Sequence, residues 1–160
     1  MRCPNYDCSA QVQRRLEHFV SDAAVGISGL GKAAIASLVR AGKLKQPADL
    51  YALEAEQLSA VASKKHAEKL VAAIAASRKQ ERWRFVYGLG VPDVGPAAAK
   101  AIARHFTLSA WIGAGERDYR ASGVSEAARR ASLAFFADER RRAVAEALAR
   151  AVDQPESTNP

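Results

Sequence analysis

Residues Ile27-Ser28-Gly29-Leu30-Gly31-Lys32 decide the fold, because they form a Gly-apolar-Gly turn directly before an apolar-periodic segment. In that segment apolar residues recur at helical spacing, at Ala34, Ile35, Leu38 and Val39. The pattern predicts that the turn lies at the N-terminus of a helix. Two glycines allow a tight, partly left-handed backbone and leave the main-chain amides open to a ligand. Amides at a helix N-terminus favour an anion such as phosphate, and Lys32 adds a positive charge there. The alternative is an ordinary helix start after a loop.

Comparable turns recur along the chain at a nearly constant spacing. They begin at Gly29, Val61, Asp93 and Gly123, and so lie 32, 32 and 30 residues apart. Such a period predicts a repeated supersecondary unit, with each turn followed by an alanine-containing helix. The four turns read Gly29-Leu30-Gly31, Val61-Ala62-Ser63, Asp93-Val94-Gly95 and Gly123-Val124-Ser125. Only the first turn keeps both glycines and the second keeps neither, so we expect unequal roles in binding.

Composition bounds the fold class and the partner. The chain has 160 residues, of which 49% are hydrophobic and only 7% aromatic. Alanine supplies much of the hydrophobic fraction, which favours an all-α fold of close-packed short helices. The net charge is +7, which suits a polyanionic partner. The sequence shows neither an apolar run of transmembrane length nor a signal-peptide pattern.

Cys3 and Cys8 are the two cysteines of the chain and have the spacing C-x4-C. Without a secretion signal, this pair indicates a metal site rather than a disulfide. Structural zinc takes four ligands, and the nearest nitrogen donor, His18, falls inside the first predicted helix. We therefore expect zinc only if a second cysteine pair is supplied upstream. The alternative is two free thiols in a loop.

Periodicity and breaker residues divide the remainder of the chain into short helices. Gly42 is predicted to end the second helix, and Pro47 to start a new helical turn. Residues 107–122 are predicted to be connecting turns anchored by Trp111 and Ile112, and 153–160 a linker or tail. The predicted helical ranges are 11–24, 48–53, 54–61, 64–77, 78–87, 97–106, 126–136 and 138–152.

Aromatic and basic residues alternate between Arg78 and Tyr87. This pattern is compatible with base stacking, but at helical spacing it more often marks a core stripe beside a solvated basic face. We therefore predict that Trp83 and Val86 lie in the core.

The turns resemble the hairpins of helix-hairpin-helix DNA-binding motifs. From about Arg2 to Ala151, the order of sequence blocks resembles the middle-to-late part of bacterial NAD-dependent DNA ligases. The resemblance implies half of a four-cysteine zinc finger, followed by four tandem helix-hairpin-helix motifs that grip the minor groove of nicked duplex DNA. The blocks are RCPNYDCSAQ, LEHFVSDAAVGISGLGKAAIASL, PADLYAL, RFVYGLGVPDVGPAAAKAIARHF and LAFFADERRR.

The sequence also departs from that family. It has no K-x-D-G motif, which in the family carries the catalytic lysine, so we expect no catalytic residue here. The resemblance implies that the nucleotidyltransferase domain, the NAD-binding segment, the oligonucleotide-binding barrel and the first cysteine pair lie upstream. A BRCT domain would follow. The resemblance also implies that the full-length members of the family use NAD as a cofactor and that this segment does not bind it. We expect a bacterial cytoplasmic, nucleoid-associated protein with a zinc-finger knuckle at 1–11, a helix-hairpin-helix domain at 12–152 and a tail at 153–160.

The leading hypothesis is sequence-independent binding of duplex DNA, as the DNA-binding part of a ligase that acts in replication and repair. The alternative is a stand-alone helix-hairpin-helix DNA-binding or recruitment protein without ligase activity. A base-excision glycosylase would need a carboxylate or lysine facing a base pocket, and no such constellation is found. Cys3 and Cys8 are the candidate metal ligands. The candidate DNA-binding residues are Gly29, Leu30, Gly31, Lys32, Lys64, Lys65, Val94, Gly95, Lys100, Gly123 and Arg129.

Overall fold

The computed structural model describes Tyr6 and residues 8–152. Cys3 and the predicted tail at 153–160 lie outside the described residues. Within them the chain contains helices and no strand, which confirms the all-α prediction. The described residues divide into two compact units, one up to Gln80 and one from Glu81 onward, so the predicted domain at 12–152 contains two units with two hairpins each.

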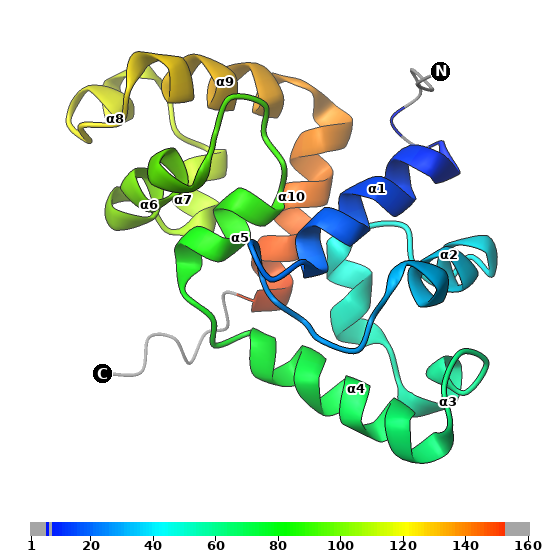
Figure 1. Cartoon of the computed structure of the whole chain (residues 1–160). Helices are drawn as coiled ribbons and strands as arrows, with labels where there is room; N and C mark the ends of the chain where they lie inside the picture. The colour runs from blue at the N-terminus through cyan, green and yellow to red at the C-terminus, as the bar shows by residue number, and fades with distance from the viewer. Residues whose placement is uncertain (1–5, 7, 153–160) are drawn as a thin grey trace. The chain divides into compact units, whose positions relative to one another are not determined.

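The first unit contains a helical hairpin, a single 3-10 turn and a second helical hairpin (Figure 1). Its first pair buries Leu16 and Phe19 of α1 and Ile35 and Leu38 of α2. Ile35 and Leu38 belong to the apolar series predicted after the first turn, in which Ala34 and Val39 are half-buried. The first helix ends at Val20 rather than at the predicted Ala24, and Ala23 beyond its end is exposed. The elements are α1 (Ser9–Val20), α2 (Lys32–Arg40), η1 (Pro47–Ala52), α3 (Ala55–Leu58) and α4 (Lys64–Ser77).

Gly42 and Pro47 delimit elements as predicted. Gly42 has φ +75°, and the amides of Gly42 and Lys43 donate to the carbonyls of Val39 and Leu38, at 3.0 and 2.9 Å. These two bonds form a Schellman motif that ends α2. Pro47 is the first residue of η1, where its missing N–H costs no hydrogen bond.

The second unit contains α5 and α6 as one helical hairpin and α9 and α10 as the final helix pair (Figure 1). The stretch 107–122, predicted as connecting turns, instead contains the short helices α7 and α8. Thr107 and Asp118 cap these helices, accepting from the amides of Ala110 and Gly115. The elements are α5 (Arg82–Gly88), α6 (Pro96–His105), α7 (Leu108–Ile112), α8 (Glu116–Arg120), α9 (Glu126–Ala137) and α10 (Glu139–Val152).

Trp111 anchors the core of the second unit, as predicted. Its side chain is fully buried, and its Nε1–H donates to Ser132 Oγ at 3.1 Å. Its ring meets Phe136 edge-on, with the centroids 4.8 Å apart. Ile112, the other predicted anchor, is buried as well. Across residues 8–152, no helix is both long and apolar enough to span a bilayer.

Candidate nucleic-acid interface

The four hairpins share one backbone register. The third residue of every hairpin is the N-cap of the following helix. The first residue is left-handed in three of them, with φ +98° at Gly29, +67° at Asp93 and +79° at Gly123. The repeat read from the sequence is therefore present in the backbone, and Asp93 takes a conformation that favours glycine. The four N-caps are Gly31, Ser63, Gly95 and Ser125.

At the first and third hairpins the corner residues are exposed, while the apolar residue between them is buried. Leu30 and Val94 are only 5% and 6% exposed, so their side chains pack in the core. Only their backbone atoms can contact a ligand. The flanking residues named as candidates are all exposed: Gly29, Gly31, Lys32, Gly95 and Gly123.

Two hairpins present open helix N-termini. Gly31 and Gly95 cap α2 and α6 without a side-chain hydrogen bond, and a Cβ at either residue would meet nothing within 4 Å. The first intrahelical amide of α2 is that of Ile35, which donates to the Gly31 carbonyl at 3.0 Å. The amides before it are therefore available as donors to an anion. Pro96 removes one such donor from α6.

The other two hairpins are closed by their own serines. Ser63 Oγ accepts from the His66 amide, and Ser125 Oγ from the Ala128 amide, both at 3.2 Å. These bonds use donors that an anion would otherwise take. Each unit thus contains one open and one capped hairpin. Serine as the third hairpin residue is the sequence signal that distinguishes the capped hairpins.

The first corner packs on α4, the helix that the second hairpin begins. A Cβ at Gly29 would lie 2.6 Å from Leu70 Cδ2 and 3.9 Å from His66 Nε2. Lys64 and Lys65 are exposed in the same first turn of α4 as His66. The open hairpin and this lysine pair therefore belong to one surface of the first unit.

A shallow hollow of about 670 Å³ lies beside the first hairpin. Two carboxylates, Glu17 and Asp22, line it together with Lys32, so its electrostatic field is mixed. The hairpin contributes main-chain and side-chain atoms from Ile27 through Lys32, and α1 and α2 contribute Val20 and Ile35.

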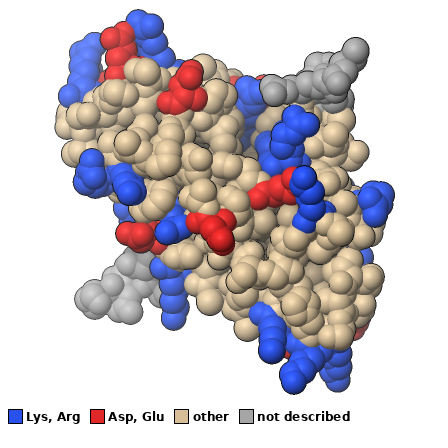
Figure 2. All heavy atoms as spheres, in the orientation of Figure 1, with Lys and Arg blue, Asp and Glu red and all other residues tan. Residues whose placement is uncertain are grey.

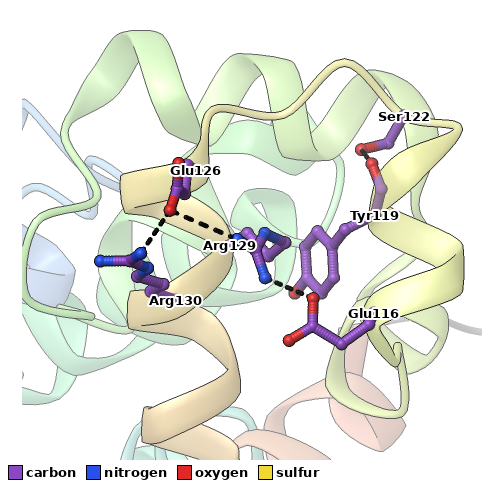
Figure 3. A network of polar contacts seen from close by, with 6 residues as sticks. All are labelled: Glu116, Tyr119, Ser122, Glu126, Arg129 and Arg130. Carbon is purple, nitrogen blue, oxygen red and sulfur yellow. Dashed lines mark hydrogen bonds and ion pairs between the residues drawn. The ribbon is translucent and has the colours of Figure 1, made fainter.

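Arg129 is engaged by two carboxylates (Figure 3). It forms ion pairs with Glu116 and, at 3.7 Å, with Glu126, and its side chain is 23% exposed. Glu126 also pairs with Arg130. The positive charge that the sequence offered at Arg129 is therefore largely offset within the second unit.

Lys100 lies exposed on α6, with Nζ 4.8 Å from the centroid of the Trp83 ring. The prediction of a core position is correct for Val86 and wrong for Trp83, which is only half-buried. The reason is that α5 begins at Arg82 rather than Arg78, so Trp83 occupies its first turn while Phe85 and Val86 enter the core. The basic hollow around Trp83 was not predicted from the sequence.

On the face drawn in Figure 2, Lys and Arg side chains form several separate groups, with acidic side chains between some of them. The basic charge is thus distributed in local clusters on this face.

The described residues do not complete a zinc site. Cys8 is half-exposed and is the N-cap of α1, with its carbonyl accepting from Val12 at 2.9 Å. Among the residues whose placement is described, no three His, Cys, Asp or Glu side chains are grouped to hold a metal. The donor set present in this part of the chain therefore does not fit structural zinc.

The repeated hairpins define the class of protein to which the chain belongs, a tandem helix-hairpin-helix domain. Residues 22–76 match the family described as SAM-like helix-hairpin-helix tandem. The chain is 42% identical, over 97% of its length, to DNA ligase 1 of Opitutus terrae, and 35% identical, over 99%, to the DNA ligase of Desulforamulus reducens. The DNA ligase of Carboxydothermus hydrogenoformans is 40% identical over 86% of the chain.

These matches, together with the helix-hairpin-helix fold, support a C-terminal fragment of a DNA ligase. It spans about a quarter of the length of the relatives, 24% and 25% for the first two.

Proposed function

We propose that this chain is the part of a DNA ligase that binds duplex DNA through its phosphates, and that its substrate in replication and repair is nicked DNA. The observation that carries the proposal is the pair of open helix N-termini at Gly31 and Gly95. Backbone amides at a helix N-terminus recognise phosphate without reading bases. Binding of this kind is independent of sequence.

Lysines near the hairpins supply the long-range attraction. Lys32 and the Lys64–Lys65 pair flank the first corner, and Lys100 lies on the helix that follows the third. If these four lysines each neutralise one phosphate, log K should fall against log salt with a slope of about −3.6. Affinity would then drop about 100-fold between 50 and 200 mM salt.

The capped hairpins have a smaller role in this proposal. Their serines already satisfy an amide that an open hairpin offers to phosphate. We propose that the second hairpin acts through Lys64 and Lys65, and that the fourth, which includes Gly123, contributes least.

The test is a salt titration of binding by the whole chain, measured by fluorescence anisotropy on nicked and intact duplexes of the same sequence. We expect a steep negative slope on both, and tighter binding to the nicked duplex. Affinity that does not change with salt would overturn phosphate binding. Equal affinity for the two duplexes would overturn the preference for nicks.

We propose zinc only for a form that has additional ligands, with Cys3 and Cys8 as half of the set. Zinc content should be low for the chain alone and should rise to about one per molecule when a second cysteine pair is joined upstream. Stoichiometric zinc in the chain alone would contradict this proposal.

A further inference from the structure

A basic hollow in the second unit lies outside the four hairpins. Its volume is about 580 Å³. Its lining contains four cationic side chains, one carboxylate and the half-buried indole of Trp83. The lining residues are Glu81, Arg82, Trp83, Arg84, Lys100, Ala103 and Arg104.

Three of the four cations around the hollow, Arg82, Arg84 and Lys100, have contacts that hold them in place. Trp83 has the Arg84 guanidinium 4.9 Å and the Lys100 ammonium 4.8 Å from its ring centroid, both within cation–π range. The indole itself is fixed, because its Nε1–H donates to Glu81 Oε1 at 3.2 Å. Arg82 donates to the Ala103 carbonyl at 3.1 Å, which joins the start of α5 to the end of α6.

The hollow and the third hairpin share the exposed face of α6. Ala97, Lys100 and Arg104 are exposed and follow one another at spacings of three and four residues. Residues with this spacing lie on one face of a helix. From Ala97 to Arg104 the helix rises about 10 Å.

We propose that the hollow binds a second backbone phosphate of the duplex, farther along α6 than the phosphate held at Gly95. Lys100 and Arg104 contact the phosphate, and Trp83 is a positioning residue that orients Lys100 and Arg84. This inference rests on the proposed DNA binding and extends it to a second contact on α6. Continuity with the open hairpin along one helix face favours a nucleic-acid backbone over an acidic peptide.

The first experiment compares two double variants that remove the same charge. Lys100→Gln with Arg104→Gln removes the cations of the hollow. Arg142→Gln with Arg150→Gln removes two exposed cations from α10 and is the matched control. We expect the first pair to weaken binding to nicked duplex about tenfold and to reduce the salt slope by about 1, because one phosphate contact is lost. Equal losses in the two pairs, or wild-type affinity in the first pair, would overturn the proposal.

The second experiment examines Trp83 directly. Trp83 and Trp111 are the tryptophans of the chain, and Trp111 is fully buried, so acrylamide quenching reports mainly on Trp83. Saturating duplex should lower this quenching, and unchanged quenching with DNA bound would contradict the assignment. Trp83→Phe, which keeps an aromatic ring under the cations, should retain affinity that Trp83→Leu loses. Equal affinity in these two variants would remove Trp83 from the positioning role.

Failure of this inference can be separated from failure of the proposed function. If the wild-type chain binds DNA while the Lys100/Arg104 pair behaves like its control, the hollow is not a DNA site and the hairpin proposal stands. If the wild-type chain does not bind DNA, both proposals fall. If the pair abolishes binding of poly-glutamate and leaves DNA binding intact, the hollow belongs to an acidic protein partner and the inference is overturned.

Discussion

A Cβ atom at Gly29 would lie 2.6 Å from Leu70 Cδ2, so the corner of the first hairpin is seated directly on α4. Leu70 is only 2% exposed and has little room to move. Gly29 also has φ +98°, a conformation that side chains rarely adopt. This glycine is therefore required by the fold, in contrast to Gly31, which faces open space two residues later.

Gly29→Ala should lower the free energy of unfolding by about 1–3 kcal/mol, because backbone strain and overpacking act together. Urea denaturation followed by circular dichroism measures the effect. Gly31→Ala is the matched control and should change stability by less than about 1 kcal/mol, since its φ of −82° suits any residue. Equal stabilities for the two variants would contradict the packing described for the first corner.

Asp93 places a negative charge at the corner of an open hairpin, two residues before Gly95. Asp93→Asn and Asp93→Gly should both tighten binding to duplex DNA about two- to threefold at low salt, because each removes repulsion of a phosphate. Their stabilities should stay within about 1 kcal/mol of the wild type, since relief of backbone strain and loss of a helix-dipole contact oppose each other. Unchanged affinity in both variants would place the DNA away from the third hairpin.

Arg129 and Lys32 should differ as DNA contacts. Arg129 is paired with Glu116 and Glu126, whereas Lys32 is exposed beside the open N-terminus of α2. Arg129→Ala should therefore weaken binding less than about twofold, and Lys32→Ala about three- to tenfold. Anisotropy titrations measure the affinities of both variants. A larger loss for Arg129→Ala than for Lys32→Ala would contradict the prediction. In a Glu116→Gln background, Arg129→Ala should weaken DNA binding more than it does in the wild type, because Arg129 then has one carboxylate partner fewer.

Tyr119 makes the second unit sensitive to alkaline pH. Burial raises the pKa of its hydroxyl, and the nearby Ser132 and Trp111 side chains offset part of that rise. A group with a raised folded-state pKa stabilises the fold fully below its unfolded value, near pH 10, and loses that contribution as the pH rises further. Among the described residues, the buried Tyr119 hydroxyl has no hydrogen-bond partner of standard geometry.

Tyr119→Phe should therefore keep its neutral-pH stability within about 1 kcal/mol of the wild type and should lose less stability above pH 10. The comparison is Tyr51→Phe, which breaks a 2.8 Å hydrogen bond to Ser77 and should cost about 1 kcal/mol at pH 7. Chemical denaturation at neutral and alkaline pH measures both variants. Parallel pH profiles for wild type and Tyr119→Phe would refute the assignment.

Local sequence signals predicted most of the fold because they act within a few residues. The spacing of the hairpins placed the N-caps at Gly31 and Gly95, and Gly42 and Pro47 marked the boundaries of α2 and η1. Serine N-caps are also local signals, so the side-chain caps of the second and fourth hairpins could have been inferred from Ser63 and Ser125.

What the sequence missed depends on contacts between elements. Glu116 reaches Arg129 across 13 residues, only because α8 and α9 are brought together by the fourth hairpin. The hollow at Trp83 requires both the start of α5 at Arg82 and the return of α6 past it. Neither arrangement can be read from periodicity, since each is a consequence of how two helices pair.

The most direct test of the central claim is the DNA affinity of the Gly31→Val, Gly95→Val double variant. Both glycines have extended backbones and open space around them, so valine fits the unbound fold and covers the amides that would meet phosphate. We expect a folded double variant destabilised by no more than about 2 kcal/mol, since valine is a poorer N-cap than glycine. Its affinity for nicked duplex should fall at least about tenfold. Wild-type affinity in a folded double variant would contradict the claim that these open helix N-termini bind DNA.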